Sequence, residues 1–158
     1  MRILLQMAAI AGVALLGAGA TYLFHGPPAR GVACDPAKLK PDEVCLSRVM
    51  DEWRNAVVWV DARSRREWRE LSVAGSLLWN LDTAEDMQAF EAAGAMRMMD
   101  GQRVVVFCTN ENCGTSRQVA ERIRGLQFGN EVFVLHGGWR ALANAGPHGP
   151  TLAKSPQP

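Results

Sequence analysis

The chain has 158 residues, 48% of them hydrophobic and 21% charged, and a formal net charge of +1. These values are typical of one globular domain with an extension. The sequence contains no basic run, which argues against a nucleic-acid-binding function.

Residues 3–24 form a nearly continuous apolar segment. At about 22 residues it is long enough to span a bilayer as a helix. Arg2 would hold its amino end in the cytoplasm. We therefore expect residues 1–25 to be an inner-membrane anchor, with the domain on the periplasmic or another extracytoplasmic side. The alternatives are a signal peptide cleaved after Ala18-Gly19-Ala20, which would release the domain to the periplasm, and a buried core helix.

The four cysteines can pair in three ways if all form disulfides. Their spacing favours two local pairs, Cys34 with Cys45 and Cys108 with Cys113. A Cys34–Cys45 bond would suit an oxidising compartment and would staple the linker, residues 26–43, to the domain. The alternatives are unpaired structural thiols or a zinc site that uses all four cysteines. The sequence has no CxxC pair, so we expect no metal site. We expect no other cofactor.

Residues 44–146 are expected to form the domain, and residues 147–158, with four prolines and little apolar content, a disordered tail. Helix periodicity, apolar runs and capping-box patterns predict the following elements in chain order: a helix over 44–53, a strand over 57–60, a helix over 65–70, a short strand over 76–79, a helix over 82–93 ended by Gly94, a strand over 104–107, a helix from Thr115 to about Leu126, a strand over 132–135 and a helix over 139–144.

The alternation of strands and helices predicts an α/β fold. Right-handed crossovers would give a parallel sheet with helices on both faces. Ligands bind such sheets at the carboxyl ends of the strands. Asp61, Cys108 and His136 each follow a predicted strand, so we expect them at that edge.

Cys108 follows a buried strand and precedes a polar loop and a helix. Main-chain amides of the loop and the positive end of the helix dipole would stabilise its thiolate, the reactive form of cysteine. Cys108 is therefore the candidate nucleophile, and the alternative is a buried, inert thiol. Gly114 would permit a positive φ just before the helix. The expected anion cradle consists of Thr109, Asn110, Glu111, Asn112, Gly114, Thr115 and Ser116.

Three segments together resemble a rhodanese-like domain: residues 57–64 (VVWVDARS), the strand, loop and helix around Cys108, and residues 132–145 (VFVLHGGWRALANA). The resemblance covers about residues 45–146 and implies a single α/β domain with a reactive cysteine at Cys108. The family's Gly-His-Ile-x-Gly-Ala segment keeps only its second glycine, here Gly75. The loop after Cys108 is also longer than in members with a compact loop.

The resemblance implies a sulfurtransferase in which Cys108 takes a sulfane sulfur from thiosulfate or a persulfide and passes it to a thiol acceptor. It suggests that Asp61 and Arg63 organise the edge of the site, with a turn-fixing ion pair as the alternative. Arg117 is a candidate for binding an anionic donor, or it faces solvent. The expected partners are a small-molecule or protein sulfur donor, a thiol acceptor and the membrane.

Cys113 opens a different interpretation. As a resolving thiol it would attack oxidised Cys108 and form a disulfide, which would make the protein a thiol–disulfide oxidoreductase or an oxidant sensor. A third hypothesis is a non-catalytic rhodanese-like interaction module. The departure at the segment around Gly75 favours this module, and the presence of Cys108 argues against it.

Overall fold

The computed structural model describes residues 6–7, 12, 32–98, 101–109 and 114–155. The elements discussed below all belong to the unit Gly31–Pro158. Within the described part of the chain, no helix is both long and apolar enough to cross a membrane. The predicted span, residues 3–24, lies almost entirely outside the described residues.

A five-stranded parallel sheet forms the centre of the domain. Its strands, in spatial order, are β1 (Glu43–Val44), β6 (Val132–Leu135), β5 (Arg103–Phe107), β2 (Val57–Asp61) and β4 (Leu77–Leu78). The central strands are apolar because helices cover both faces of the sheet. The predicted α/β fold with a parallel sheet is confirmed.

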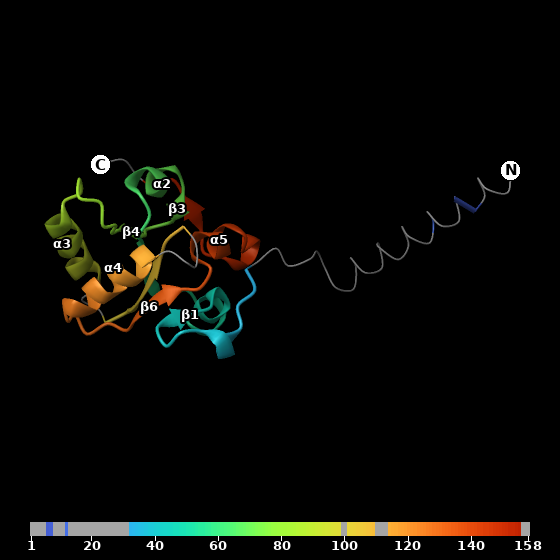
Figure 1. Ribbon diagram of the computed structural model, residues 1–158, viewed down its shortest axis with the longest axis horizontal. Coiled ribbons are helices and arrows are strands. Elements are labelled where there is room, and N and C mark those ends of the chain that lie inside the picture. The colour runs from blue at the N-terminus through green and yellow to red at the C-terminus, as the bar shows by residue number, and fades with distance from the viewer. Residues whose placement is uncertain (1–5, 8–11, 13–31, 99–100, 110–113, 156–158) are drawn as a thin grey trace. The chain divides into compact units, whose positions relative to one another are not determined.

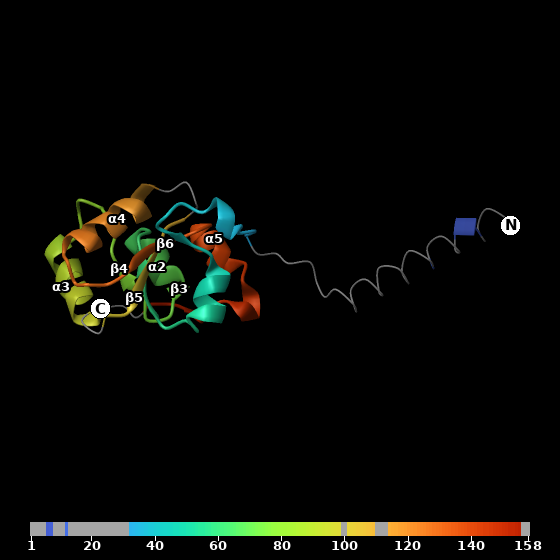
Figure 2. The same cartoon turned by 90° about the horizontal axis from the view of Figure 1, so that it is seen from below.

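Alternate residues of the central strands face opposite layers. Val58, Val104 and Val106 belong to one hydrophobic cluster, and Trp59 and Phe107 to the other. The first face is covered by α2 (Arg65–Glu70), α3 (Met87–Met98) and α4 (Gly114–Gly125). The second face is covered by η2 (Arg48–Glu52) and α5 (Gly138–Ala143) (Figures 1 and 2). Cys108, the residue after β5, continues this alternation and lies on the first face, with Val104 and Val106.

Helix α3 is shifted from its predicted position. It begins at Met87, because Asp86 Oδ1 accepts from the backbone N–H groups of Gln88 and Ala89 at 3.0 and 3.1 Å and so caps it. Gly94 does not end the helix. It is buried against Trp79, and a Cβ there would lie 2.5 Å from the indole Cζ3.

Helix α4 also differs from prediction at its start. It already includes Gly114, so Thr115 lies within the first turn and is not the cap. Gly114 does not adopt the expected positive φ. The apolar stripe holds, because Val119 and Ile123 are both buried against the sheet.

The segment after α5 is ordered, so the predicted disordered tail is wrong for residues 147–155. A 3₁₀ turn, η3 (Gly146–His148), leads to β7 (Leu152–Ala153). β7 pairs antiparallel with β3 (Ser72–Val73), and this ladder satisfies backbone groups on both segments.

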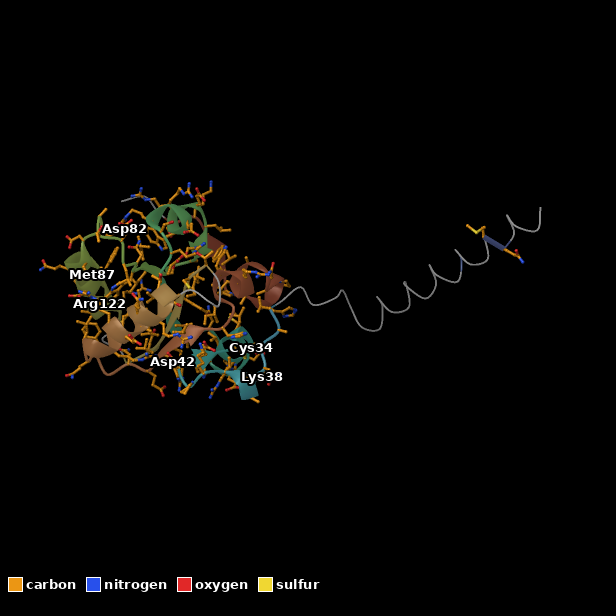
Figure 3. All side chains as sticks on the ribbon, viewed as in Figure 1. Cys34, Lys38, Asp42, Asp82, Met87 and Arg122 are labelled. Atoms are coloured by element: carbon orange, nitrogen blue, oxygen red, sulfur yellow. A yellow bond between two sulfur atoms is a disulfide. The ribbon has the colours of Figure 1, made fainter. Side chains whose placement is uncertain are left out.

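The expected linker is partly structured and is attached to the domain. It contains the 3₁₀ turn η1 (Pro36–Lys38), and a disulfide joins Cys34 to Cys45 with the Cα atoms 5.7 Å apart. Figure 3 labels Cys34 and Asp42 on the side of the domain that carries β1. The bond takes both cysteines away from a zinc site built from all four.

Candidate functional site

Three parallel strands bring the predicted polar residues to one edge of the sheet. Asp61 ends β2 and pairs in register with Phe107, the last residue of β5. Cys108 directly follows β5, and His136 directly follows β6. The carboxyl edge of the sheet therefore carries these residues, as the strand pattern predicted.

Cys108 lies on the face of the sheet that α4 covers. Its thiol donates to Ser116 Oγ at 3.3 Å, and Ser116 is a buried residue of the first turn of α4. The sulfur therefore faces the end of the helix whose dipole is positive. The side chain is 1% exposed and packs within the hydrophobic cluster under α4. The site thus combines a favourable field for a thiolate with deep burial.

Asp61 and Arg63 form an ion pair at the end of β2, the contact that the alternative interpretation of these two residues expected. Arg63 Nη2 donates to Asp61 Oδ2 at 2.7 Å and Nε donates to Oδ1 at 3.0 Å, a bidentate contact. Both side chains are buried, at 0% exposure for Asp61 and 3% for Arg63. The Ser72 hydroxyl donates to the same carboxylate at 2.6 Å, and Arg63 donates to the Leu71 carbonyl at 2.8 Å.

The buried pair reaches Cys108 through Trp139. The Arg63 guanidinium lies 3.8 Å from the centroid of the Trp139 ring, a close cation–π contact. The backbone N–H of Trp139 in turn donates to the carbonyl of Cys108 at 2.7 Å. Asp61 and Arg63 therefore position the backbone of Cys108 through α5 and do not reach the sulfur by any described contact.

Glu67 is a residue of this region that the sequence analysis did not single out. Its carboxylate accepts from the Ser64 hydroxyl at 2.6 Å and, over a long contact of 3.5 Å, from the hydroxyl of Thr109, the residue after Cys108. Burial raises the pKa of Glu67, but hydrogen bonds from Ser64 and Thr109 and the charge of Arg63 outweigh it, and the pKa is lowered. An ionised carboxylate therefore lies beside the start of the loop. The Ser64–Glu67 capping box was the sequence signal for it.

Arg117 is joined to two carboxylates that precede and begin β1. Its Nη2 donates to Glu43 Oε1 at 2.6 Å, and its Nη1 donates to Asp42 Oδ1 at 3.3 Å. Burial raises the pKa of Glu43, but the hydrogen bond and charge of Arg117 help to lower it overall. Arg124 lies 3.7 Å from the same Asp42. This placement ties α4 to β1 and gives no support to the predicted donor-binding role of Arg117.

Part of the predicted cradle cannot be placed. Asn110, Glu111, Asn112 and Cys113 lie outside the described residues, so the resolving role of Cys113 stays a prediction. Of the described members, Thr109 contacts Glu67, and Gly114, Thr115 and Ser116 belong to α4. Thus the structure brings Ser116 to the sulfur and leaves the remaining cradle untested.

The sequence matches the family model of the rhodanese-like domain over residues 46–145, well over half of the chain. No curated protein shows significant similarity to it.

Solved structures share its fold at low identity. The rhodanese-like domain of an Anabaena protein is 18% identical with a TM-score of 0.53, and the match covers 73% of this chain and 81% of that one. A thiosulfate sulfurtransferase from Pseudomonas aeruginosa is 16% identical with a TM-score of 0.52. That match covers 78% of this chain but only 21% of the enzyme, so the matched part of this chain corresponds to about a fifth of it.

Proposed function

The chain belongs to the rhodanese-like domain family, and from this premise we propose that it is a sulfurtransferase that carries a sulfane sulfur as a persulfide on Cys108. The observation that supports the proposal most is the direction of the Cys108 thiol. It faces the Ser116 hydroxyl and the first turn of α4. Hydroxyl donors and a helix amino terminus favour a negatively charged sulfur.

The proposed reaction has two balanced steps. The Cys108 thiolate attacks the outer sulfur of a donor persulfide; a new S–S bond forms, the donor's own S–S bond breaks, and the donor thiolate leaves with the electron pair. An acceptor thiolate then attacks the outer sulfur on Cys108, and the Cys108 thiolate leaves. With thiosulfate as donor, sulfite is the leaving group. Neither step needs a further oxidant or reductant.

The surrounding residues have separate roles in this proposal. Ser116 offers a hydrogen bond to the charged sulfur. The Asp61–Arg63 pair fixes Trp139, whose N–H holds the Cys108 carbonyl. Asp61, Arg63 and Trp139 are positioning residues, because none of their contacts named here reaches the reacting sulfur.

Steady-state turnover tests the proposal. Purified protein should transfer sulfur from a persulfide donor to a thiol acceptor above the uncatalysed rate, and Cys108→Ser should return the rate to background. The control is the Cys34→Ser, Cys45→Ser double variant, which removes two sulfurs outside the site and should keep its turnover. Equal turnover in wild type and Cys108→Ser would overturn the proposal.

The burial of Cys108 favours a second candidate, a non-catalytic rhodanese-like module. A side chain that is 1% exposed does not present its sulfur to a donor. The alkylation rate of the native protein separates the two candidates. If Cys108 reacts with iodoacetamide at least as fast as an unstructured cysteine peptide, the module is excluded. A rate far below that of the peptide supports it.

We further propose that residues 3–24 anchor the domain in the inner membrane, with the domain outside the cytoplasm. The apolar segment is long enough to span a bilayer as a helix. The Cys34–Cys45 disulfide is consistent with an oxidising compartment outside the cytoplasm. A signal peptide cleaved after Ala20 is the competing outcome. Membrane fractionation with the intact mass of the mature chain distinguishes them: an anchor keeps the full mass in the membrane fraction.

A further inference from the structure

Two arginines of the site region already have carboxylate partners. The Arg63 guanidinium is held in the buried contact with Asp61. Arg117, which follows Ser116 in α4, is held at 2.6 Å from Glu43 and at 3.3 Å from Asp42. The positive charge of each guanidinium is therefore balanced within the protein and is not available to attract an anionic substrate.

Glu67 adds a negative charge at the same edge of the site. The described donors to its carboxylate, the Ser64 backbone N–H and hydroxyl and the Thr109 hydroxyl, are all neutral. The charge of Arg63 also acts on Glu67, but Asp61 already balances that charge, and neutral donors orient a carboxylate without cancelling its charge. The surface beside Thr109, the residue after Cys108, therefore carries a negative field, which opposes the approach of a dianion.

We propose that the site selects a protein or peptide persulfide with little net negative charge over a small dianion such as thiosulfate, and that Asp42, Glu43 and Glu67 determine this specificity. The inference rests on the proposed sulfurtransferase function. Asp42 and Glu43 act by occupying Arg117, whereas Glu67 acts through its own charge. The donor passes its outer sulfur to Cys108, and the rest of the donor leaves with the electron pair, as a thiolate from a persulfide and as sulfite from thiosulfate.

Two small donors of different charge probe this selection. Thiosulfate is a dianion, and cysteamine persulfide carries an ammonium group that balances its sulfur charge. For wild-type protein we expect kcat/KM to be at least tenfold higher for cysteamine persulfide, after correction with Cys108→Ser. Raising the salt concentration should narrow the ratio, because salt screens the repulsion.

The variants test which residues set the preference. The Asp42→Asn, Glu43→Gln double variant releases Arg117, and kcat/KM for thiosulfate should rise about tenfold. Adding Arg117→Gln to that variant should remove the gain, which a general change of structure would not predict. Glu131→Gln, which removes one carboxylate far from the site, is the control, because Glu131 precedes β6 and lies at the opposite edge of the sheet.

Glu67→Gln gives a second, milder test. Glutamine at this position can keep the capping box, so the helix start should be preserved while the charge is removed. We expect kcat/KM for thiosulfate to rise about threefold and that for cysteamine persulfide to fall. Unchanged thermal melting would establish that this variant is folded even if the Asp42 and Glu43 variant is not.

The outcomes separate the inference from the function it rests on. If neither donor yields turnover that depends on Cys108, the sulfurtransferase proposal fails. If turnover depends on Cys108 but wild type prefers thiosulfate, or if Glu67→Gln leaves the donor ratio unchanged, only the inferred selectivity is wrong. A higher ratio of thiosulfate to cysteamine persulfide in Glu67→Gln, with Glu131→Gln unchanged, supports it.

Discussion

Asp61 has a buried carboxylate that depends on its hydrogen-bond partners. Its carboxylate is fully buried and is satisfied by Arg63 and by the Ser72 hydroxyl. Removing its charge would leave the Arg63 guanidinium buried without its counter-ion, which costs far more than losing an exposed pair.

We therefore expect Asp61→Asn to lower the free energy of unfolding by about 3–5 kcal/mol in urea titrations. Glu52→Gln breaks the exposed pair between Arg48 and Glu52 and serves as the comparison, with a loss of about 0.5 kcal/mol or less. Similar losses in the two variants would contradict the greater cost expected for breaking the buried Asp61–Arg63 pair.

Helix α3 shows how packing sets the limits of an element. Gly94 lies inside the helix, where alanine would ordinarily stabilise by up to about 1 kcal/mol. Here a Cβ would lie 2.5 Å from Trp79, so overpacking outweighs propensity. We predict that Gly94→Ala lowers the free energy of unfolding by about 1–3 kcal/mol.

The control for this variant is Gly125→Ala at the end of α4, where nothing lies within 4 Å of the added Cβ. It should be neutral or slightly stabilising in the same urea titration. A stabilised Gly94→Ala variant would contradict the close approach of Trp79.

A second element-scale contact joins α2 to the turn before α3. Arg65 Nε donates to Glu85 at 2.8 Å, and this hydrogen bond is the main reason that the pKa of Glu85 is lowered from its ordinary 4.5. When the pKa of a carboxyl group is lowered in the folded state, the group stabilises the folded protein at pH values above its unfolded-state pKa. This contribution is lost as the pH falls through the folded-state pKa. The contact therefore contributes at neutral pH and not in strong acid.

Glu85→Gln should accordingly be less stable than wild type at pH 7, by about 0.5–1 kcal/mol because Arg65 is partly exposed to solvent. The difference should be smaller at about pH 3 than at pH 7, because Glu85 loses its charge as the pH falls through its lowered folded-state pKa. Urea unfolding at the two pH values measures it, and a difference that grows in acid would refute the assignment.

At the scale of the whole molecule, the Cys34–Cys45 disulfide fixes the segment before β1 to the sheet. Val32, two residues earlier, packs against Gly137, where a Cβ would lie 2.8 Å from Val32 Cγ1. Because the bond closes a short loop, its removal in the double serine variant should cost about 2–3 kcal/mol of unfolding free energy. Equal urea midpoints for the oxidised wild type and this variant would contradict a stabilising role.

The sequence predicted the features that depend on burial along a run. Val57–Val60 and Val104–Phe107 are strands because apolar residues fill both faces, and this order of elements is enough to place Cys108 at the carboxyl edge. β1, β3 and β7 have only two residues each and exist through their partners, so no local pattern marks them. Likewise, the side chains of Asp82 and Asp86 can both accept hydrogen bonds from the first N–H groups of a helix. In the folded chain Asp86 caps α3, whereas Asp82 accepts from the N–H of Ala84 in the preceding turn.

The site was predictable to the same degree. The resemblance to the rhodanese-like family drew attention to Asp61 and Arg63, but the contacts of Glu67 with Thr109 and of Arg117 with Glu43 join positions 42 and 74 residues apart. Contacts of that kind depend on how the crossovers place α2 and α4, which hydrophobic periodicity does not determine.

The mass of the Cys108-containing peptide after incubation with a persulfide donor tests the central claim most directly. The account predicts an adduct of one sulfur atom on Cys108 in the folded protein, removed by an acceptor thiol and absent when Cys108→Ser is treated in the same way. An unmodified Cys108 peptide from folded, donor-treated protein would contradict it.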